Sequence, residues 1–239
     1  MNTCFRWTGG AAWRRGGTVA VTAVAVLVCW ALILTQSCQS RSHRTGRAEA
    51  PRERFDYYIL SLSWAPAFCA GENRAETSRE CDPQRHTGFI VHGLWPELED
   101  GRPLEFCRAV PPARAAIVDD LLPIMPDRML IQHEWRAHGS CTGLPASEYF
   151  AAVRRAADRV RIPELFLSTR LGFTISPREI EHRFGEASHF GDVRAIYVQC
   201  RRGELTEVRV CLTKNLEPRP CGDRVRDCAS RTLFVRRIQ

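Results

Sequence analysis

Hydrophobic positions fall into one long run free of charge near the start, followed by short periodic segments. The run VAVTAVAVLVCWALILT covers residues 19–35, and the residues before it include Arg6, Arg14 and Arg15 but no acidic residue. A positive start followed by an apolar run is typical of an export signal. The run is rather long for a cleaved signal and rather short for a membrane span. Residues 1–37 are therefore predicted to be a signal sequence or a membrane anchor, and both remain open.

The next segment, residues 38–53, is polar and basic and is predicted to be a tether, because it lacks apolar periodicity. It begins at Cys38, where TQSC resembles the cleavage site of bacterial lipoproteins, whose cysteine carries lipid. The match is imperfect, because such sites usually have leucine where Thr35 stands. Lipid on Cys38 and an unmodified Cys38 both remain open. The folded domain is predicted to cover residues 54–239.

Periodic segments beyond residue 54 predict a mixture of helices and strands. Residues 55–63 combine aromatic and β-branched residues in partial alternation, which predicts a strand, and Ser147 and Ser176 offer helix N-caps. Helices gather in the middle of this region and strands at its ends, so the pattern predicts an α+β fold. The predicted strands are 55–63, 88–91, 194–200 and 205–213, and the predicted helices are 112–122, 133–139, 147–160 and 176–184.

The charge and the cysteine content of the chain indicate what kind of partner it binds and in which compartment it folds. The chain carries a net charge of +7, and the part beyond Cys38 holds 31 basic and 27 acidic residues. This mild excess suits a polyanionic partner without proving one. Eight cysteines follow residue 54, and an even number behind an export signal predicts four disulfides in an oxidising compartment. Zinc sites are disfavoured because no C-x-x-C pair occurs.

Two segments contain residues suited to catalysis. In FIVHGLWPE, residues 89–97, a buried strand delivers His92 to a loop that contains glycine. In HEWRAHGSC, residues 133–141, Glu134 and His138 are four positions apart and share a helix face, which suits a carboxylate that supports an imidazole. His133 and His138 are five positions apart, or about 140° around a helix, so the metal-binding helix of zinc proteases is disfavoured.

These segments resemble a known family. HGLWP at 92–96 and HEWRAHGSC at 133–141 are similar to the two active-site segments of the ribonuclease T2 family, and FDYYILSLSWAPAFC at 55–69 is similar to its opening strand. The similarity spans residues 54–228 and indicates an exported, bacterial-type member. It implies a disulfide-stapled α+β fold, with helices packed on an antiparallel sheet. It also implies a monomer that cleaves single-stranded RNA through a 2′,3′-cyclic phosphate, without metal or cofactor and with low base specificity.

The resemblance also implies roles for individual residues. His92 and His138 would form the acid/base pair, with His138 as the expected base and the reverse order still open. Glu134 and His133 would hold the phosphate and its transition state. Trp95 could stack on a base or simply pack beneath the loop. The implied disulfides are Cys69–Cys81, Cys107–Cys141, Cys200–Cys228 and Cys211–Cys221.

The chain departs from the family pattern at Ala137, where the family usually has lysine. The only lysine, Lys214, is distant in sequence, and Arg136 is the nearest cation along the chain. This departure leaves open a second function, that of a catalytically weakened RNA-binding envelope protein on the same fold. Retention of all three histidines and Glu134 argues for an enzyme.

Overall fold

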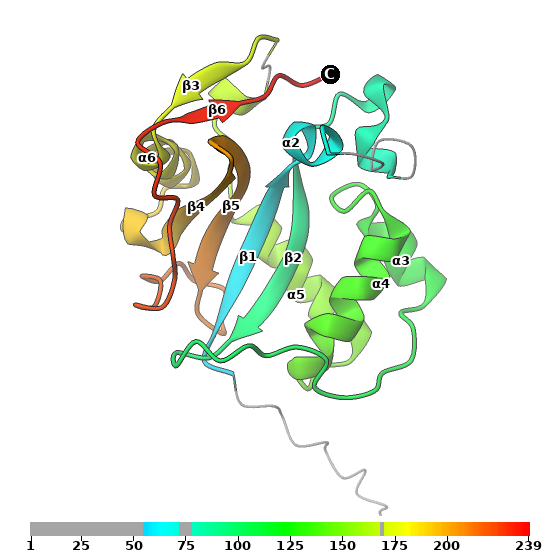
Figure 1. Cartoon of the computed structure of the whole chain (residues 1–239). Coiled ribbons are helices and arrows are strands. Elements are labelled where there is room, and N and C mark those ends of the chain that lie inside the picture. Colours follow the sequence, from blue (N-terminus) through cyan, green and yellow to red (C-terminus); the bar gives the residue numbers. More distant parts are fainter. Residues whose placement is uncertain (1–54, 72–77, 168–169) are drawn as a thin grey trace, which may run out of the picture. The chain divides into compact units, whose positions relative to one another are not determined.

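A twisted six-stranded sheet forms the centre of the structure, a computed structural model that describes residues 55–71, 78–167 and 170–239 (Figure 1). The strand order is β2-β1-β5-β6-β3, and β4 pairs with β5. Neighbouring strands are antiparallel except for the short parallel contact between β5 and β6. The strands are β1 (Tyr57–Trp64), β2 (Phe89–Glu97), β3 (Phe173–Ile175), β4 (Ile196–Arg201), β5 (Glu204–Leu212) and β6 (Leu233–Val235).

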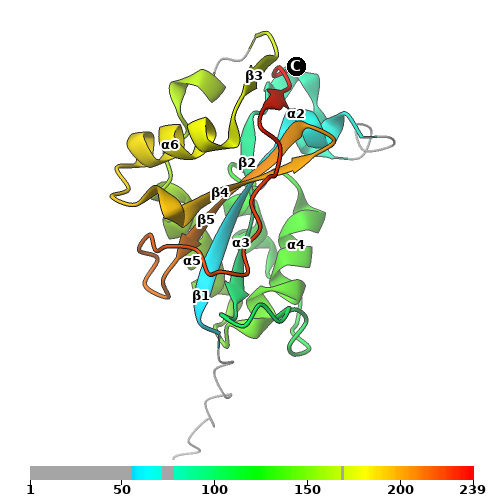
Figure 2. The same cartoon turned by 60° about the vertical axis from the view of Figure 1, so that its left-hand side comes forward.

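Helices cover one face and one side of this sheet (Figures 1 and 2). Helix α5 (Ala146–Asp158) packs against β1 and β2, α6 (Pro177–Ser188) packs against β4, and α4 (Arg128–Ala137) packs against β2 and α3 (Ala115–Leu121). The short α2 (Ala65–Cys69) directly follows β1. The predicted α+β fold, with helices on an antiparallel sheet, is confirmed.

The two faces of β1 have different surroundings. Tyr58, Leu60, Leu62 and Trp64 alternate along the strand and belong to the main hydrophobic core. Tyr57 and Ile59 point to the other face and join a much smaller apolar cluster with Tyr197 and Cys211. Because this second cluster is small, polar side chains can lie on the same face of the sheet.

Strand β2 and helix α4 are longer than their sequence patterns predicted. Strand β2 continues to Glu97, so His92 lies inside a strand and not in a loop, which corrects the sequence-based expectation. Helix α4 begins at Arg128 because the Asp127 carboxylate accepts hydrogen bonds from the first free N–H groups, and it ends at Ala137. His138 therefore follows the helix as its C-cap residue.

The two predicted N-caps have different outcomes. Ser176 caps α6, because its hydroxyl accepts a hydrogen bond from Glu179 N at 3.2 Å. Ser147 lies inside α5, which begins at Ala146 after Pro145, so the prediction of a cap at Ser147 was wrong.

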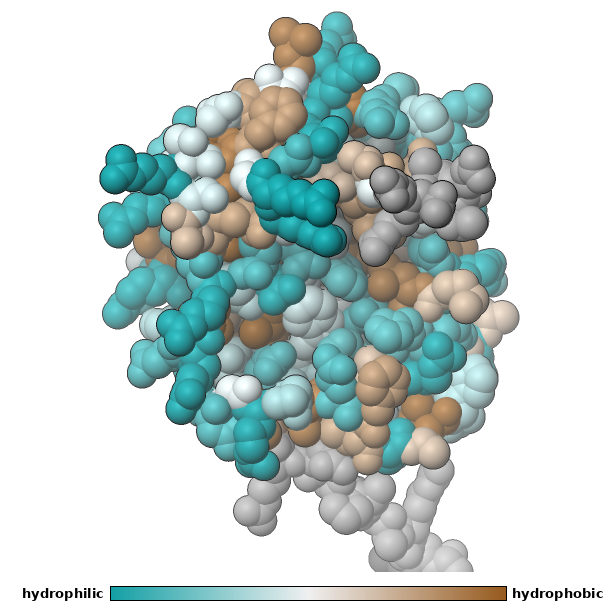
Figure 3. All heavy atoms as spheres, in the orientation of Figure 1, coloured by the Kyte–Doolittle hydropathy of each residue, from teal (hydrophilic) through white to brown (hydrophobic). Residues whose placement is uncertain are grey.

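Four disulfides join the pairs that the family resemblance implies: Cys69–Cys81, Cys107–Cys141, Cys200–Cys228 and Cys211–Cys221. The predicted signal or anchor and the tether, with Cys38, lie outside the described residues. Within the ranges given above, no helix is long and apolar enough to cross a membrane. The face seen in Figure 1 is mostly hydrophilic, with hydrophobic residues scattered across it (Figure 3).

Replacing both Cys107 and Cys141 by alanine should lower the free energy of unfolding by about 2–4 kcal/mol, because the disulfide restricts the unfolded chain. The Cys69–Cys81 pair is a matched control, since its separation is 12 residues against 34. The longer loop should cost about 1 kcal/mol more when opened. Urea unfolding of both double variants measures this difference. An equal loss would show that residual structure in the unfolded chain outweighs loop entropy.

Candidate active site

A β-bulge in β2 places two successive residues toward α4. In the pairing of β1 with β2, Leu62 lies opposite Val91 and Ser61 lies opposite Gly93, so His92 is an extra residue. A bulge interrupts the usual alternation of side chains and re-aims the residues around it. His92 and Gly93 consequently both face Glu134 of α4.

Gly93 allows the Glu134 carboxylate to rest directly on the backbone of β2. A Cβ atom at Gly93 would lie 2.0 Å from Glu134 Oε2 and 2.5 Å from Trp95 Nε1. No side chain fits in that space. The glycine of the HGLWP segment is therefore required by close approach and not by turn geometry.

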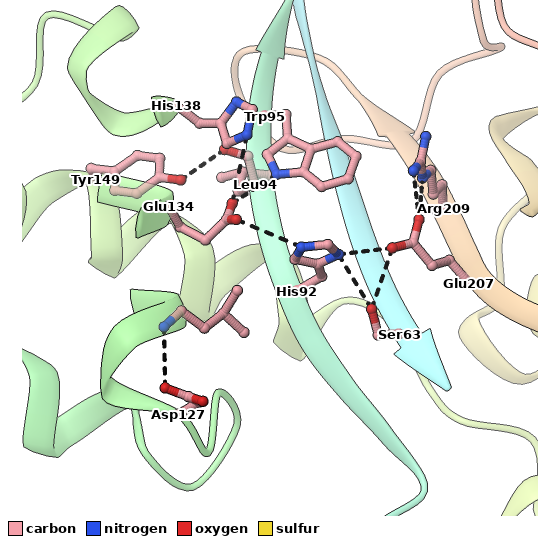
Figure 4. A network of polar contacts seen from close by, with 11 residues as sticks. Ser63, His92, Leu94, Trp95, Asp127, Glu134, His138, Tyr149, Glu207 and Arg209 are labelled. Carbon is pink, nitrogen blue, oxygen red and sulfur yellow. Dashed lines mark hydrogen bonds and ion pairs between the residues drawn. The ribbon is translucent and has the colours of Figure 1, made fainter. Parts of the chain in front are cut away.

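Glu134 joins the residues that the two sequence segments predicted (Figure 4). Its side chain is 1% exposed, and Oε2 accepts a hydrogen bond from Trp95 Nε1 at 2.8 Å. His92 Nε2 lies 3.7 Å from Oε1, and His138 Nε2 lies 3.9 Å from Oε2. Burial raises the pKa of Glu134 to about 7, although the charge of His92 and the hydrogen bond from Trp95 act in the opposite direction.

His92 is held from its other side by a residue outside both segments. Its Nδ1 lies 2.8 Å from Oε1 of Glu207 on β5, and Ser63 Oγ lies 3.3 Å from the same nitrogen. Burial lowers the pKa of His92, but the hydrogen bond with Glu207 and the charge of Glu134 outweigh it, so the net shift is upward. Burial likewise opposes ionisation of Glu207, yet the bond with His92 and the charge of Arg209 hold its pKa at about 2.

His138 has the opposite electrostatic environment. Burial, together with the charges of His133 and His92, lowers its pKa to about 4. Its Nδ1 is buried and makes no hydrogen bond within the described residues. The two imidazoles therefore share one carboxylate but favour different protonation states.

The structure places His133 at the rim of the site. Its side chain is exposed on α4, and the edge of the Phe106 ring approaches it with centroids 6.0 Å apart. It is near enough for its charge to act on His138. His133 is thus positioned beside the pair of catalytic candidates and not between them.

Trp95 is packed within the site. The guanidinium of Arg209 lies 4.7 Å from the centre of the indole ring, and the rings of His92 and His138 each lie 5.3 Å away. A base that stacked on the ring would compete with Arg209 for that position. Trp95 supports Glu134 in the structure, and base stacking stays a prediction.

The position that lacks lysine is covered. Ala137 has 0% exposed surface, and its carbonyl accepts a hydrogen bond from Phe106 N at 2.7 Å. Arg136 is exposed and lies about 200° around the helix from Glu134. It therefore does not replace the positive charge of the missing lysine. Among the residues that the structure describes, Arg209 brings a guanidinium to the site, and its Nε donates to Glu207 Oε2 at 2.7 Å.

Sequence reasoning missed Glu207 and Arg209 as site residues. The only signal is their alternation in LTEVRVC, which places both on one face of a strand without identifying that face. No three His, Cys, Asp or Glu side chains are grouped to hold a metal ion in the part of the chain that the structure describes. The arrangement places two imidazoles with opposite pKa shifts next to the two oxygens of one buried carboxyl group.

Comparison with known proteins identifies the family. The family model described as Ribonuclease T2 family matches residues 55–221, so the chain belongs to this family. A "Probable ribonuclease" of Haemophilus influenzae is 30% identical over 192 residues, which cover 75% of this chain and 64% of that protein. "Ribonuclease I" of Escherichia coli strain K12 is 27% identical over 202 residues, covering 66% of this chain and 75% of that protein.

Solved structures share the fold. The RNase-related protein from Calystegia sepium superimposes with a TM-score of 0.60 at 19% identity, covering 75% of this chain and 96% of that one. RNase NT in complex with 5′-AMP gives a TM-score of 0.55 at 21% identity, and the match covers 76% of this chain and 98% of that one.

Substituting Gly93 by alanine should reduce kcat for RNA cleavage by roughly 10- to 100-fold, because the new methyl group displaces the Glu134 carboxylate and catalysis is sensitive to such shifts. Gly191→Ala is the control, since nothing lies within 4 Å of a Cβ there. Steady-state kinetics on both variants decide the question. Wild-type kcat in Gly93→Ala would mean that Glu134 need not rest against β2.

Proposed function

We propose that this endoribonuclease of the T2 family cleaves single-stranded RNA by metal-independent transphosphorylation, with His138 as the base and His92 as the acid. The observation that carries the proposal is that two imidazoles face one buried carboxyl group, with His92 Nε2 3.7 Å from Glu134 Oε1 and His138 Nε2 3.9 Å from Oε2. The pKa shifts of the two rings, upward for His92 and downward for His138, agree with this geometry. A base must be unprotonated and an acid protonated at the same pH, and these shifts produce that combination.

His138 begins the reaction. With a pKa of about 4 it is neutral at physiological pH, and its Nε2 faces the site. Nε2 takes the proton of the ribose 2′-OH, and the 2′-oxygen then forms a bond to the adjacent phosphorus. DNA lacks this hydroxyl and is not cleaved.

His92 completes the reaction. Its Nε2 faces Glu134 and the site while Glu207 binds Nδ1, and the raised pKa favours the protonated ring. Nε2 gives its proton to the 5′-oxygen as the bond from phosphorus to that oxygen breaks. The products are a 2′,3′-cyclic phosphate and a free 5′-hydroxyl.

Glu134 and His133 act on the phosphoryl oxygens. The pKa of Glu134, about 7, means that the carboxyl group is protonated in a large fraction of molecules and can donate a hydrogen bond to an anion. Donors already in place where negative charge develops are worth more in a buried site than in water. His133 binds the phosphate from the rim, and low base specificity follows if Trp95 offers only a stacking surface.

The second candidate, an RNA-binding envelope protein with weakened catalysis, rests on the missing lysine at position 137. It is not favoured, because simple RNA binding does not require two histidines with opposite pKa shifts.

The proposed location is outside the cytoplasm. It rests on the apolar run at 19–35 and on four disulfides, which persist in oxidising compartments. We infer an exported monomer, periplasmic or secreted if the signal is cleaved and membrane-tethered if residues 19–35 or a lipid on Cys38 hold it. Mass spectrometry of the native protein tests this by the loss or retention of about the first 37 residues.

His92→Ala and His138→Ala should each lower kcat for RNA about 10²- to 10⁴-fold while RNA binding survives, because each removes a proton carrier. The double variant should be little worse than either single variant, since the two histidines act as a unit. Glu134→Gln should cost less than either. A gel assay on single-stranded RNA and DNA, with and without EDTA, measures these effects. Activity that EDTA abolishes, or that survives in His92→Ala, would refute the assignment.

The pH dependence of kcat/KM should be bell-shaped. Activity rises as His138 loses its proton near pH 4, and it falls as pH passes the raised pKa of His92. His92 and Glu134 lie 3.7 Å apart, so the alkaline limb reports a proton coupled between the two groups. Initial rates in buffers of constant ionic strength test the profile. An acid limb near the ordinary histidine pKa of about 6.5 would contradict the assignment of His138 as base.

A further inference from the structure

Glu207 reaches His92 from a strand that neither active-site segment includes. In the pairing of β1 with β5, Ser63 lies opposite Glu207, and the Ser63 hydroxyl lies 3.3 Å from both His92 Nδ1 and Glu207 Oε1. The Glu207 side chain is 13% exposed, and its Oε1 lies 2.8 Å from His92 Nδ1. A short contact to a nearly buried carboxylate is a strong, directional restraint on the imidazole ring.

The other oxygen of Glu207 is also fixed. Arg209 Nε donates to Oε2 at 2.7 Å, and the same guanidinium covers the Trp95 ring. Trp95 in turn donates to Glu134, which faces His92 Nε2. The contacts form a closed circuit through β5, β2 and α4 (Figure 4). Glu207 therefore cannot turn away from His92 without breaking its pair with Arg209.

We propose that Glu207 is a positioning residue for His92: by accepting a hydrogen bond from Nδ1–H, it fixes the ring so that Nε2 faces the reacting phosphate. The inference rests on the proposed function, in which His92 is the general acid. A carboxylate on one ring nitrogen determines which nitrogen carries the transferable proton and stabilises the imidazolium form. His138 lacks such a partner at Nδ1 within the described residues, which suits a base.

The charges around His92 determine what removal of Glu207 does. Strand β5 presents Glu207 and Arg209, α4 presents Glu134 with His138 at its end, and β1 presents only the neutral Ser63. Without the charge of Glu207, the unopposed Arg209 disfavours the imidazolium. The pKa of His92 must then fall, and the acid is lost at lower pH.

The first experiment compares Glu207→Gln and Glu207→Asp with the wild type. Glu207→Gln should lower kcat on RNA roughly 10- to 100-fold and move the alkaline limb of the pH profile to lower pH. Glu207→Asp keeps the charge at a longer distance, so its kcat and its alkaline limb should lie between those of Glu207→Gln and the wild type. In the His92→Ala background, Glu207→Gln should have no further effect, because the glutamate acts through that ring.

A substrate with a better leaving group separates positioning from general damage. Uridine 3′-(4-nitrophenyl phosphate) releases 4-nitrophenolate, which needs no proton. Loss of the acid should therefore matter little for this compound, and Glu207→Gln should cleave it within about 3-fold of the wild-type rate, well inside the range that general acid catalysis contributes. A variant that was merely misfolded would lose both substrates equally.

Glu204→Gln is the matched control, since it makes the same change on the same strand at a carboxylate that pairs with Arg236. It should leave kcat and the pH profile unchanged. NMR titration of the His92 ring measures its pKa directly and needs no turnover. An unchanged His92 pKa in Glu207→Gln overturns the positioning role. If the wild type fails to cleave RNA, the proposed function fails, and the titration still decides whether Glu207 controls His92.

Discussion

The buried carboxyl group of Glu134 is the constraint on which the rest of the site depends. Burying a carboxylate to 1% exposure is costly, and the structure supplies one donor, the Trp95 indole N–H, with imidazole nitrogens of His92 and His138 at 3.7 and 3.9 Å. That arrangement requires α4 to lie against β2, Gly93 to lack a side chain, and a bulge to aim His92 at the same point. The two active-site segments are therefore one structural unit, although about forty residues separate them.

His92 and His138 both face the Glu134 carboxyl group, but their other surroundings differ. His92 is bound at Nδ1 by Glu207, whose own charge is held by Arg209, whereas His138 is buried next to other histidines. The opposite pKa shifts of the two rings are thus created outside the histidines, by β5 on one side and by burial on the other.

The sequence predicted what local patterns encode. Alternation found β1, helical periodicity found α5, and the Ser176 cap with the proline after it found α6. The spacing of Glu134 and His138 predicted that both face one site, although His138 follows α4 as its C-cap. The sequence could not place Glu207 or Arg209, because only the register of β1 against β5 carries them to His92, and pairing over such a distance leaves no local trace. The bulge at His92 was not predicted, because Gly93 was interpreted as part of a loop after a short strand. The disulfide pairs came from family resemblance, as eight cysteines permit 105 pairings.

The missing lysine at position 137 changes how the site balances charge. Arg209 is largely neutralised by Glu207, so these two residues add little net charge where the phosphate binds. A phosphodiester brings one negative charge, and the transition state concentrates more on its oxygens. Such charge raises the pKa of nearby groups, and Glu134 already has a pKa of about 7. Proton uptake by Glu134 can therefore supply the positive compensation that a fixed lysine would give, without placing a permanent cation beside His138, whose pKa must stay low.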